Sequence, residues 1–213
     1  MVDKKKLYIA NDIEAAGSLV GIHSVLSWGA CVVTEKPLSK KELIAQGLVY
    51  YDELQPISLE FEEAAIRVGA SGLRILEDGG RLPCYNPKSP HFEPKALLQL
   101  LDRLGTHPII ATRNFQEWIA TVGEGYEVDP VVDTVFFDST HLQYYFSRFT
   151  RSRPYGYAGT DMDSLFRGYR KDLNASLSDA SKHIDRGIHH NSLDDSIFLA
   201  HTTREIVFNG TFS

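Results

Sequence analysis

The sequence predicts an α/β fold in which helices cover a mixed central sheet. Three observations favour this class: strand-like segments gather early in the chain, amphipathic helical segments follow, and further strand-like segments lie among those helices. The chain has 213 residues, of which 43% are apolar and 11% aromatic, enough for a full hydrophobic core. Since no linker-like stretch or internal repeat is present, we expect one domain over residues 1–213.

Five strands are predicted from short segments rich in β-branched and aromatic residues. The early ones are KKLYIANDIE (5–14), HSVLSWGACVV (23–33) and GLVYYDELQ (47–55). Two later apolar segments, PIIATRN (108–114) and PVVDTVFF (130–137), are predicted to be buried strands.

Three helices are predicted over 93–105, 139–149 and 192–208. In each of them, apolar side chains recur at a spacing of three or four residues, as with Leu142 and Tyr145 of the second segment. Such a stripe is typical of a helix that packs one side against a sheet.

Composition restricts the class of protein. A formal net charge of -6 argues against binding of duplex DNA through a broad basic surface. The N-terminal segment reaches carboxylates before any apolar stretch of signal-peptide length, and no run of about 18 apolar residues follows, so we expect a soluble, cytoplasmic protein with no membrane partner. Two cysteines, Cys31 and Cys84, are too few for a disulfide framework or a structural zinc site.

Two acids are expected on one side of the first strand. Because alternate side chains of a strand share a face, Asp12 and Glu14 project with Ala10, while Ile9 and Ile13 project to the other side. The plainer alternative is that both acids are solvated residues past the end of the strand.

Two further acids begin apolar helical stripes. Asp138 lies four residues before Leu142, and Asp195 lies four before Leu199. A charge on an apolar face is costly unless it is paired or coordinated. Each acid alone could instead be stabilised by the backbone N–H groups of a helix N-terminus. Four acids in such positions favour a shared site.

A histidine completes the candidate site. His190 stands five residues before Asp195 in a polar loop, where the alternative is an ordinary surface residue like the adjacent His189. Histidine takes protons near neutral pH, and four carboxylates suit two Mg²⁺ or Mn²⁺ ions, so the set points to two-metal phosphodiester hydrolysis. Asp12 would bridge both ions, and His190 would deprotonate the attacking water.

In this scheme the remaining acids divide between the two ions. Glu14 and Asp195 would hold the ion that carries the attacking water, and Asp138 would act on the second ion.

Three segments resemble a known set of motifs: DIEAAG (12–17), FFD (136–138) and HNSLDD (190–195) look like the three exonuclease motifs of the DnaQ-like, or DEDDh, 3′-to-5′ exonucleases. FQEW (115–118) and PYGYAGTDMDSLF (154–166) are similar to stretches of small stand-alone bacterial and phage members, so the resemblance covers nearly the whole chain. It implies a ribonuclease-H-like fold, removal of nucleoside 5′-monophosphates by two metals, and frequent homodimers.

The second motif departs from the family pattern. The family usually has Asn four residues before the aspartate and often an aromatic residue after it, whereas this chain has Thr134 and Ser139. Thr134 can still hydrogen-bond a sugar or phosphate. Asp133 is an alternative second-motif acid, but it falls in a predicted strand and misses the helical stripe, so Asp138 is preferred.

Cations gather after the second motif of this acidic chain. Arg148, Arg151 and Arg153 are candidates to track the backbone of single-stranded nucleic acid, the expected partner, although each could equally be a solvated surface residue. Tyr155, Tyr157 and Trp118 are candidates for stacking on bases. Aromatic residues in such segments more often pack in the core.

Three other functions compete with the exonuclease interpretation. A binding protein that has lost catalysis is disfavoured, because all five expected catalytic residues are present. A metal-dependent nucleotide phosphohydrolase would use the same ligands, and a structural protein would require the acids to be surface residues. The choice between RNA and DNA depends on contacts to the 2′-hydroxyl, which the residue pattern does not place.

Overall fold

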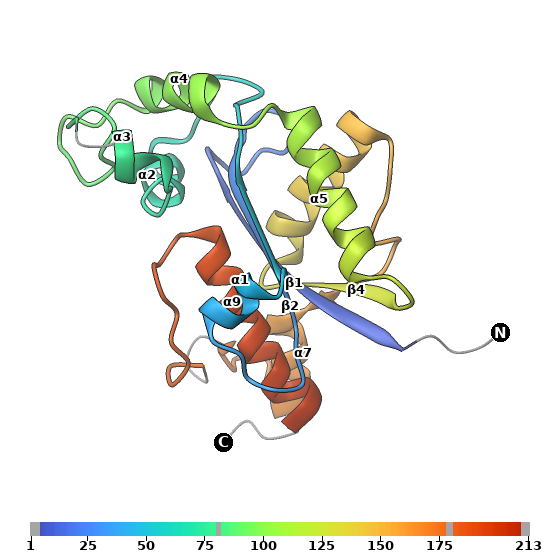
Figure 1. Cartoon of the computed structure of the whole chain (residues 1–213). Coiled ribbons are helices and arrows are strands. Elements are labelled where there is room, and N and C mark those ends of the chain that lie inside the picture. Colours follow the sequence, from blue (N-terminus) through green and yellow to red (C-terminus); the bar gives the residue numbers. More distant parts are fainter. Residues whose placement is uncertain (1–4, 80–81, 178–180, 210–213) are drawn as a thin grey trace.

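A mixed sheet forms the centre of the protein (Figure 1). The computed structural model describes residues 5–79, 82–177 and 181–209. In that part of the chain the strands are β1 (Lys6–Ala15), β2 (Val25–Val32), β3 (Val49–Glu53), β4 (Glu127–Val132) and β5 (Thr160–Asp161). Their order is β3-β2-β1-β4-β5; β2 is antiparallel to β1 and β3, and β4 is parallel to β1 and β5. The predicted fold class is confirmed.

The central strand β1 alternates its side chains between the two faces of the sheet. Ile9 and Ile13 enter one hydrophobic cluster, and Ala10 enters another. Asp12 and Glu14 therefore lie on the Ala10 side, as the alternation predicted.

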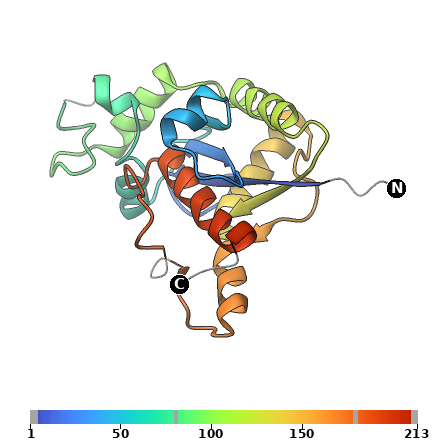
Figure 2. The ribbon, with the colours of Figure 1, turned by 60° about the horizontal axis from the view of Figure 1, so that its bottom comes forward.

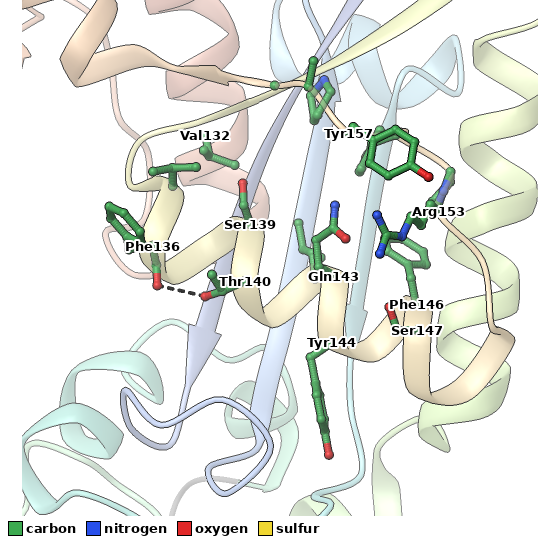
Figure 3. A pocket seen from close by; sticks show the side chains of 17 residues that line it. Val132, Phe136, Ser139, Thr140, Gln143, Tyr144, Phe146, Ser147, Arg153 and Tyr157 are labelled. Atoms are coloured by element: carbon green, nitrogen blue, oxygen red, sulfur yellow. Dashed lines mark hydrogen bonds between the residues drawn. The ribbon is translucent and has the colours of Figure 1, made fainter.

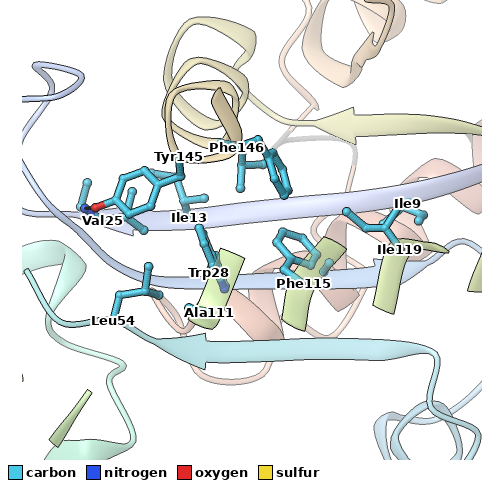
Figure 4. Packing of buried hydrophobic residues seen from close by; sticks show 13 residues of the cluster. Ile9, Ile13, Val25, Trp28, Leu54, Ala111, Phe115, Ile119, Tyr145 and Phe146 are labelled. Atoms are coloured by element: carbon cyan, nitrogen blue, oxygen red, sulfur yellow. Dashed lines mark hydrogen bonds between the residues drawn. The ribbon is translucent and has the colours of Figure 1, made fainter. Parts of the chain in front are cut away.

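One face of the sheet is covered by α5 (Pro108–Val122) and by α6 (Thr140–Tyr145). Figure 4 shows Phe115 of α5 and Tyr145 of α6 packed against Trp28 of β2. The ring centroids lie 5.4 Å apart for Trp28 and Phe115 and 5.6 Å apart for Trp28 and Tyr145. Each such burial stabilises the fold by roughly 1.5–3 kcal/mol.

The opposite face is covered by α9 (Ser192–Arg204), with α7 (Met162–Arg170) beside it (Figure 2). The short helix α1 (Lys40–Ala45) packs into the same cluster. The start of α9 rests directly on β2: a Cβ at Gly29 would lie 2.1 Å from the carbonyl oxygen of Ser192. Glycine at this position therefore allows the close approach that brings the first turn of α9 to β1 and β2.

Three helices cluster beyond the end of β1 that bears the acids (Figure 1). They are α2 (Glu63–Gly69), α3 (Ile75–Gly79) and α4 (Pro94–Leu104). A third hydrophobic cluster joins them to Ala16, the residue after β1, and to Leu26 of β2. This end of β1 is thereby fixed on the side away from α5.

One predicted strand is wrong: residues 108–114 form the first half of α5. A short apolar run has no decisive period, and here it continues into a helical stripe through Phe115 and Ile119. The His107 side chain accepts the Ile109 N–H, and Pro108 occupies the first turn, which are helix-start features.

The segment 130–137 is a strand only in its first part. β4 ends at Val132, and a π-helical turn, η1 (Val135–Ser139), follows. Asp133 therefore lies just past the strand, between β4 and η1.

The three predicted helices are present as α4, α6 and α9. α6 continues as a second π-helical turn, η2 (Phe146–Thr150), and α9 continues as a third, η3 (Glu205–Asn209). Among the described residues, no helix is both long enough and apolar enough to span a membrane.

Candidate active site

Three segments far apart in the sequence meet near the end of β1: the strand itself, η1 and the first turn of α9. Asp138 of η1 reaches β1, where its carboxylate accepts the backbone N–H of Ile13. Potential ligand atoms of Glu14, His190 and Asp195 all lie within 4.8 Å of one another. The structure thus brings the predicted acids and the predicted histidine into one cluster.

Asp12 lies at the centre of this cluster. Its Oδ2 atom is buried and has no hydrogen-bond partner among the described residues. Burial, and then the neighbouring Asp138 and Glu14 carboxylates, raise the pKa of Asp12 well above its ordinary value. The ionised form of Asp12 is therefore unfavourable unless a cation lies beside it.

Asp138 is held by backbone groups. Its Oδ1 accepts the Ile13 N–H at 3.1 Å, and its Oδ2 accepts the Thr134 N–H at 3.3 Å. Burial raises the pKa of Asp138 to about 7, although these two hydrogen bonds oppose the shift. The acid lies in the π-helical turn η1, directly before the predicted helix 139–149.

Asp195 is positioned by the N-terminus of α9. The Asn191 side chain caps this helix by accepting the Asp194 N–H, and the Asp195 N–H bonds the Asn191 carbonyl at 2.9 Å. The buried Asp195 carboxylate accepts Nε of Arg186 at 2.6 Å. The guanidinium of Arg186 also lies 4.9 Å from the ring centroid of Phe198.

His190 faces Glu14 from a constrained loop. Its Nδ1 lies 3.5 Å from Oε1 of Glu14, and this carboxylate raises the pKa of His190. The His190 backbone has φ of 60°, in the left-handed region. A Cβ at Gly72 would lie 2.3 Å from the His190 carbonyl oxygen, and Asn191 Nδ2 donates to the Gly72 carbonyl at 2.6 Å. The loop is thus packed against Gly72.

A small cavity of about 40 Å³ adjoins the cluster and is lined by Asp12, Asp133, Asp195 and Arg186, among others. Asp133, the alternative second-motif acid, is therefore also close to Asp12, and burial raises its pKa. Sequence reasoning missed Arg186. The available signal was a lone cation four residues before His190 in the loop that leads to the third motif.

The predicted substrate-binding residues occupy different surroundings. Thr134 is exposed next to Asp138, and Arg153 is exposed with its guanidinium 4.9 Å from the ring centroid of Tyr157. Arg148 donates to the Tyr144 hydroxyl at 2.9 Å. Arg151, which follows η2, is exposed in the left-handed region.

Two of the three stacking candidates have structural contacts instead. Tyr155 donates its hydroxyl to Asn11 at 2.7 Å, and Trp118 donates its indole N–H to the Gly47 carbonyl at 2.9 Å. Tyr157, by contrast, is 92% exposed.

The donor set fits a divalent cation. Burial raises the pKa values of Asp12, Glu14 and Asp138, so the protein only partly compensates their ionised forms. The unpartnered Oδ2 of Asp12 supplies an acceptor with no other use among the described residues. Hard carboxylate oxygens are the ligands that Mg²⁺ and Mn²⁺ prefer.

A comparison with curated proteins agrees with this geometry. The chain is 29% identical over 167 residues to the 3′-5′ DNA exonuclease Cap18 of Escherichia coli, a match that covers 77% of this chain and 70% of Cap18. This likeness supports a DnaQ-like 3′-to-5′ exonuclease. The expected enzyme class is confirmed at that level. No family model matches the chain.

Solved structures place this chain in the ribonuclease-H-like fold. The nuclease domain of 3′hExo, a DEDDh family member bound to rAMP, aligns with a TM-score of 0.62 and 11% identity over 98% of this chain and 94% of that one. E. coli exonuclease I in complex with a dA16 oligonucleotide aligns with a TM-score of 0.64 and 11% identity over 98% of this chain but 42% of that one. The homodimer implied by the resemblance gains no support here and stays a prediction.

Proposed function

We propose that residues 1–213 form one exonuclease domain that hydrolyses single-stranded nucleic acid from its 3′ end and releases nucleoside 5′-monophosphates. Asp12, Glu14, Asp138 and Asp195 would hold two Mg²⁺ or Mn²⁺ ions, and His190 acts as the general base. The observation that carries this proposal is the convergence of these residues around the unpartnered Oδ2 of Asp12.

His190 is oriented to take a proton from water. Glu14 faces Nδ1 of the imidazole, so it favours the tautomer with a proton on Nδ1 and leaves Nε2 free to accept one. The same carboxylate stabilises the imidazolium that forms. Glu14 in turn is held by its place in β1, opposite Ser27 of β2.

In the reaction, water attacks the phosphorus of the last phosphodiester and the bond from phosphorus to O3′ breaks. One water proton passes to Nε2 of His190, and the leaving oxygen takes a proton from solvent. The released nucleotide keeps the 5′-phosphate, and the shortened chain ends in a 3′-hydroxyl. Divalent ions, when bound, would acidify the water and stabilise charge on the leaving oxygen.

The test is degradation of 5′-labelled single-stranded RNA and DNA in Mg²⁺, Mn²⁺ or EDTA. Asp12→Asn and His190→Gln should abolish a metal-dependent ladder that the wild type produces. The matched control for the histidine is His189→Gln, whose ring lies 4.1 Å from that of His190. A comparison of Asp138→Asn with Asp133→Asn decides which acid serves the second motif; we expect the larger loss at Asp138.

The alternatives give different outcomes. Hydrolysis of free nucleotides without shortening of either polymer would indicate a nucleotide phosphohydrolase. Retention of labelled oligonucleotide by folded protein that cleaves nothing would indicate a binding protein without catalysis.

A further inference from the structure

A larger cavity, of about 760 Å³, lies beside α6, and none of the acids of the candidate active site lines it. Figure 3 shows its lining: η1, α6 and η2 form one wall, and the segment 153–159 forms the other. Pro130 and Val132 of β4 complete it. A space of this size accommodates more than one nucleobase.

Two aromatic rings at this cavity are exposed to solvent. Phe136 of η1 is 88% exposed, and Tyr157 of the segment 153–159 is 92% exposed. Figure 3 shows them as separate groups at different parts of the lining. Solvent-exposed rings that line a cavity gain free energy when a flat apolar partner covers them. The cavity therefore offers two stacking surfaces.

The charge at the cavity suits an anionic chain. Arg153 lies against Tyr157, with 4.9 Å between its guanidinium carbon and the ring centroid. No Asp or Glu side chain lines this cavity among the residues that the structure describes, although the whole chain has a net charge of -6. Exposed aromatics combined with an arginine are the usual means of binding single-stranded nucleic acid.

The cavity and the candidate active site share the turn η1. Asp138 points from this turn toward β1, whereas Phe136 and Ser139 of the same turn line the cavity. A nucleic-acid strand with its 3′ end at the acids needs only to pass over η1 to reach Phe136. Gln143 and Ser147 of α6 and η2 then supply polar groups farther along the wall.

We infer that this cavity binds bases of the single-stranded substrate upstream of the scissile nucleotide pair, by stacking on Phe136 and Tyr157 with Arg153 at the phosphate backbone. The inference rests on the proposed function. The cavity then sets the preference for longer substrates, while the acids and His190 act on the terminal linkage.

The experiment compares an octanucleotide with a dinucleotide, which is too short to reach the cavity. For Phe136→Ala and Tyr157→Ala, we expect KM for the octanucleotide to rise about 5- to 150-fold per ring, the range of base–aromatic stacking. Values of kcat/KM for the dinucleotide should stay within about twofold, since the terminal linkage makes no contact with either ring.

Two further variants separate stacking from folding. Tyr157→Phe keeps the ring and should retain the wild-type KM, whereas Tyr157→Leu should not. Tyr126→Ala removes a 43% exposed tyrosine outside the cavity and should change neither substrate. Equal losses on both substrate lengths would overturn the inference.

A second copy of the chain is the competing occupant. Light scattering of the wild type and of the Phe136→Ala/Tyr157→Ala double variant tests it. A wild-type dimer that becomes monomeric, with an unchanged ratio of octanucleotide to dinucleotide KM, would assign the cavity to self-association instead. If the wild type cleaves neither substrate, fluorescence anisotropy of a labelled octanucleotide still tests the cavity. The affinity for the octanucleotide should be lower in the double variant than in the wild type.

Discussion

The candidate active site has two halves that are held in different ways. Asp12 and Glu14 lie in β1, which is paired on both sides, and Asp138 is bonded to backbone N–H groups. His190 and Arg186 lie in a loop, where they contact the site through the carboxylates of Glu14 and Asp195. The first half is fixed by backbone structure whatever its charge, whereas the second depends on charge and on packing against Gly72.

The largest expected effect is on the strand-borne half. On the proposed function, Asp12→Asn should reduce kcat on the order of 10⁵-fold, because it would remove a ligand of the divalent ions, whose contribution to the barrier is several kcal/mol each. In EDTA the same variant should melt at a higher temperature than the wild type, because burial and like charges disfavour ionised Asp12. Degradation of labelled oligonucleotide under saturating substrate checks the first statement. Calorimetry in EDTA and in Mn²⁺ checks the second, with Mn²⁺ stabilising only the wild type.

The loop-borne half should show a smaller loss. On the proposed function, His190→Gln removes the general base and should lower kcat by about 10²–10⁴-fold. Its melting temperature should stay near that of the wild type, because the imidazole side chain is 35% exposed. His189→Gln, the neighbouring control, should keep near-normal kcat; equal losses in both variants would show that the loop, not the base, was disturbed.

Packing of the loop can be changed without touching a catalytic side chain. Gly72→Ala places a methyl group against the His190 carbonyl and should shift the loop, which lowers kcat by about 10²-fold. Gly168→Ala in α7, where an added Cβ has open space, is the matched control and should be neutral. An unchanged kcat in Gly72→Ala would mean that the loop position does not govern His190.

The smallest effect concerns stability next to η1. His141 is fully buried, and neither ring nitrogen has a hydrogen-bond partner among the described residues. Burial, with a further contribution from His23, lowers the pKa of His141 to about 4. The pKa of His141 is therefore lower in the folded protein than in the unfolded chain. The stabilisation that depends on neutral His141 is complete above pH 6.5 and is lost as the pH falls toward 4.

The test is denaturant unfolding at two pH values. Between pH 7 and pH 5, His141→Leu should lose about 2 kcal/mol less stability than the wild type. His91→Gln, which replaces an exposed histidine, should follow the wild-type pH dependence. Parallel curves for His141→Leu and the wild type would contradict the assigned shift.

The local residue pattern was sufficient to predict the positions of Asp12 and Glu14 in the strand, but it was insufficient to predict the rest of the candidate site. The alternation of β1 alone places Asp12 and Glu14 together, because side-chain direction in a strand is fixed by the backbone. Asp138 depends on a π-helical turn, which no period in the sequence announces. The pairing of Arg186 with Asp195 is a tertiary contact, so nothing in the neighbouring residues distinguishes this arginine from a solvated one.

The wrong strand at 108–114 has a similar cause. Its apolar residues fit a strand as well as a helix, and the longer stripe through Ile119 decides between them. The exposure of individual aromatic residues was also not predictable from the sequence. Phe136 and Phe137 are adjacent, yet Phe136 is 88% exposed and Phe137 packs against the core. Only the three-dimensional arrangement separates them.

The arrangement of the sheet has a consequence for protein synthesis. Asp12 is synthesised well before Asp195, which belongs to α9, so α9 can reach β2 at Gly29 only after the segment that follows β5 has also been made. A polypeptide abandoned before α9 lacks an acid, and one abandoned before residue 190 also lacks the base. On the proposed function, translation products that end before residue 190 therefore cannot cleave nucleic acid.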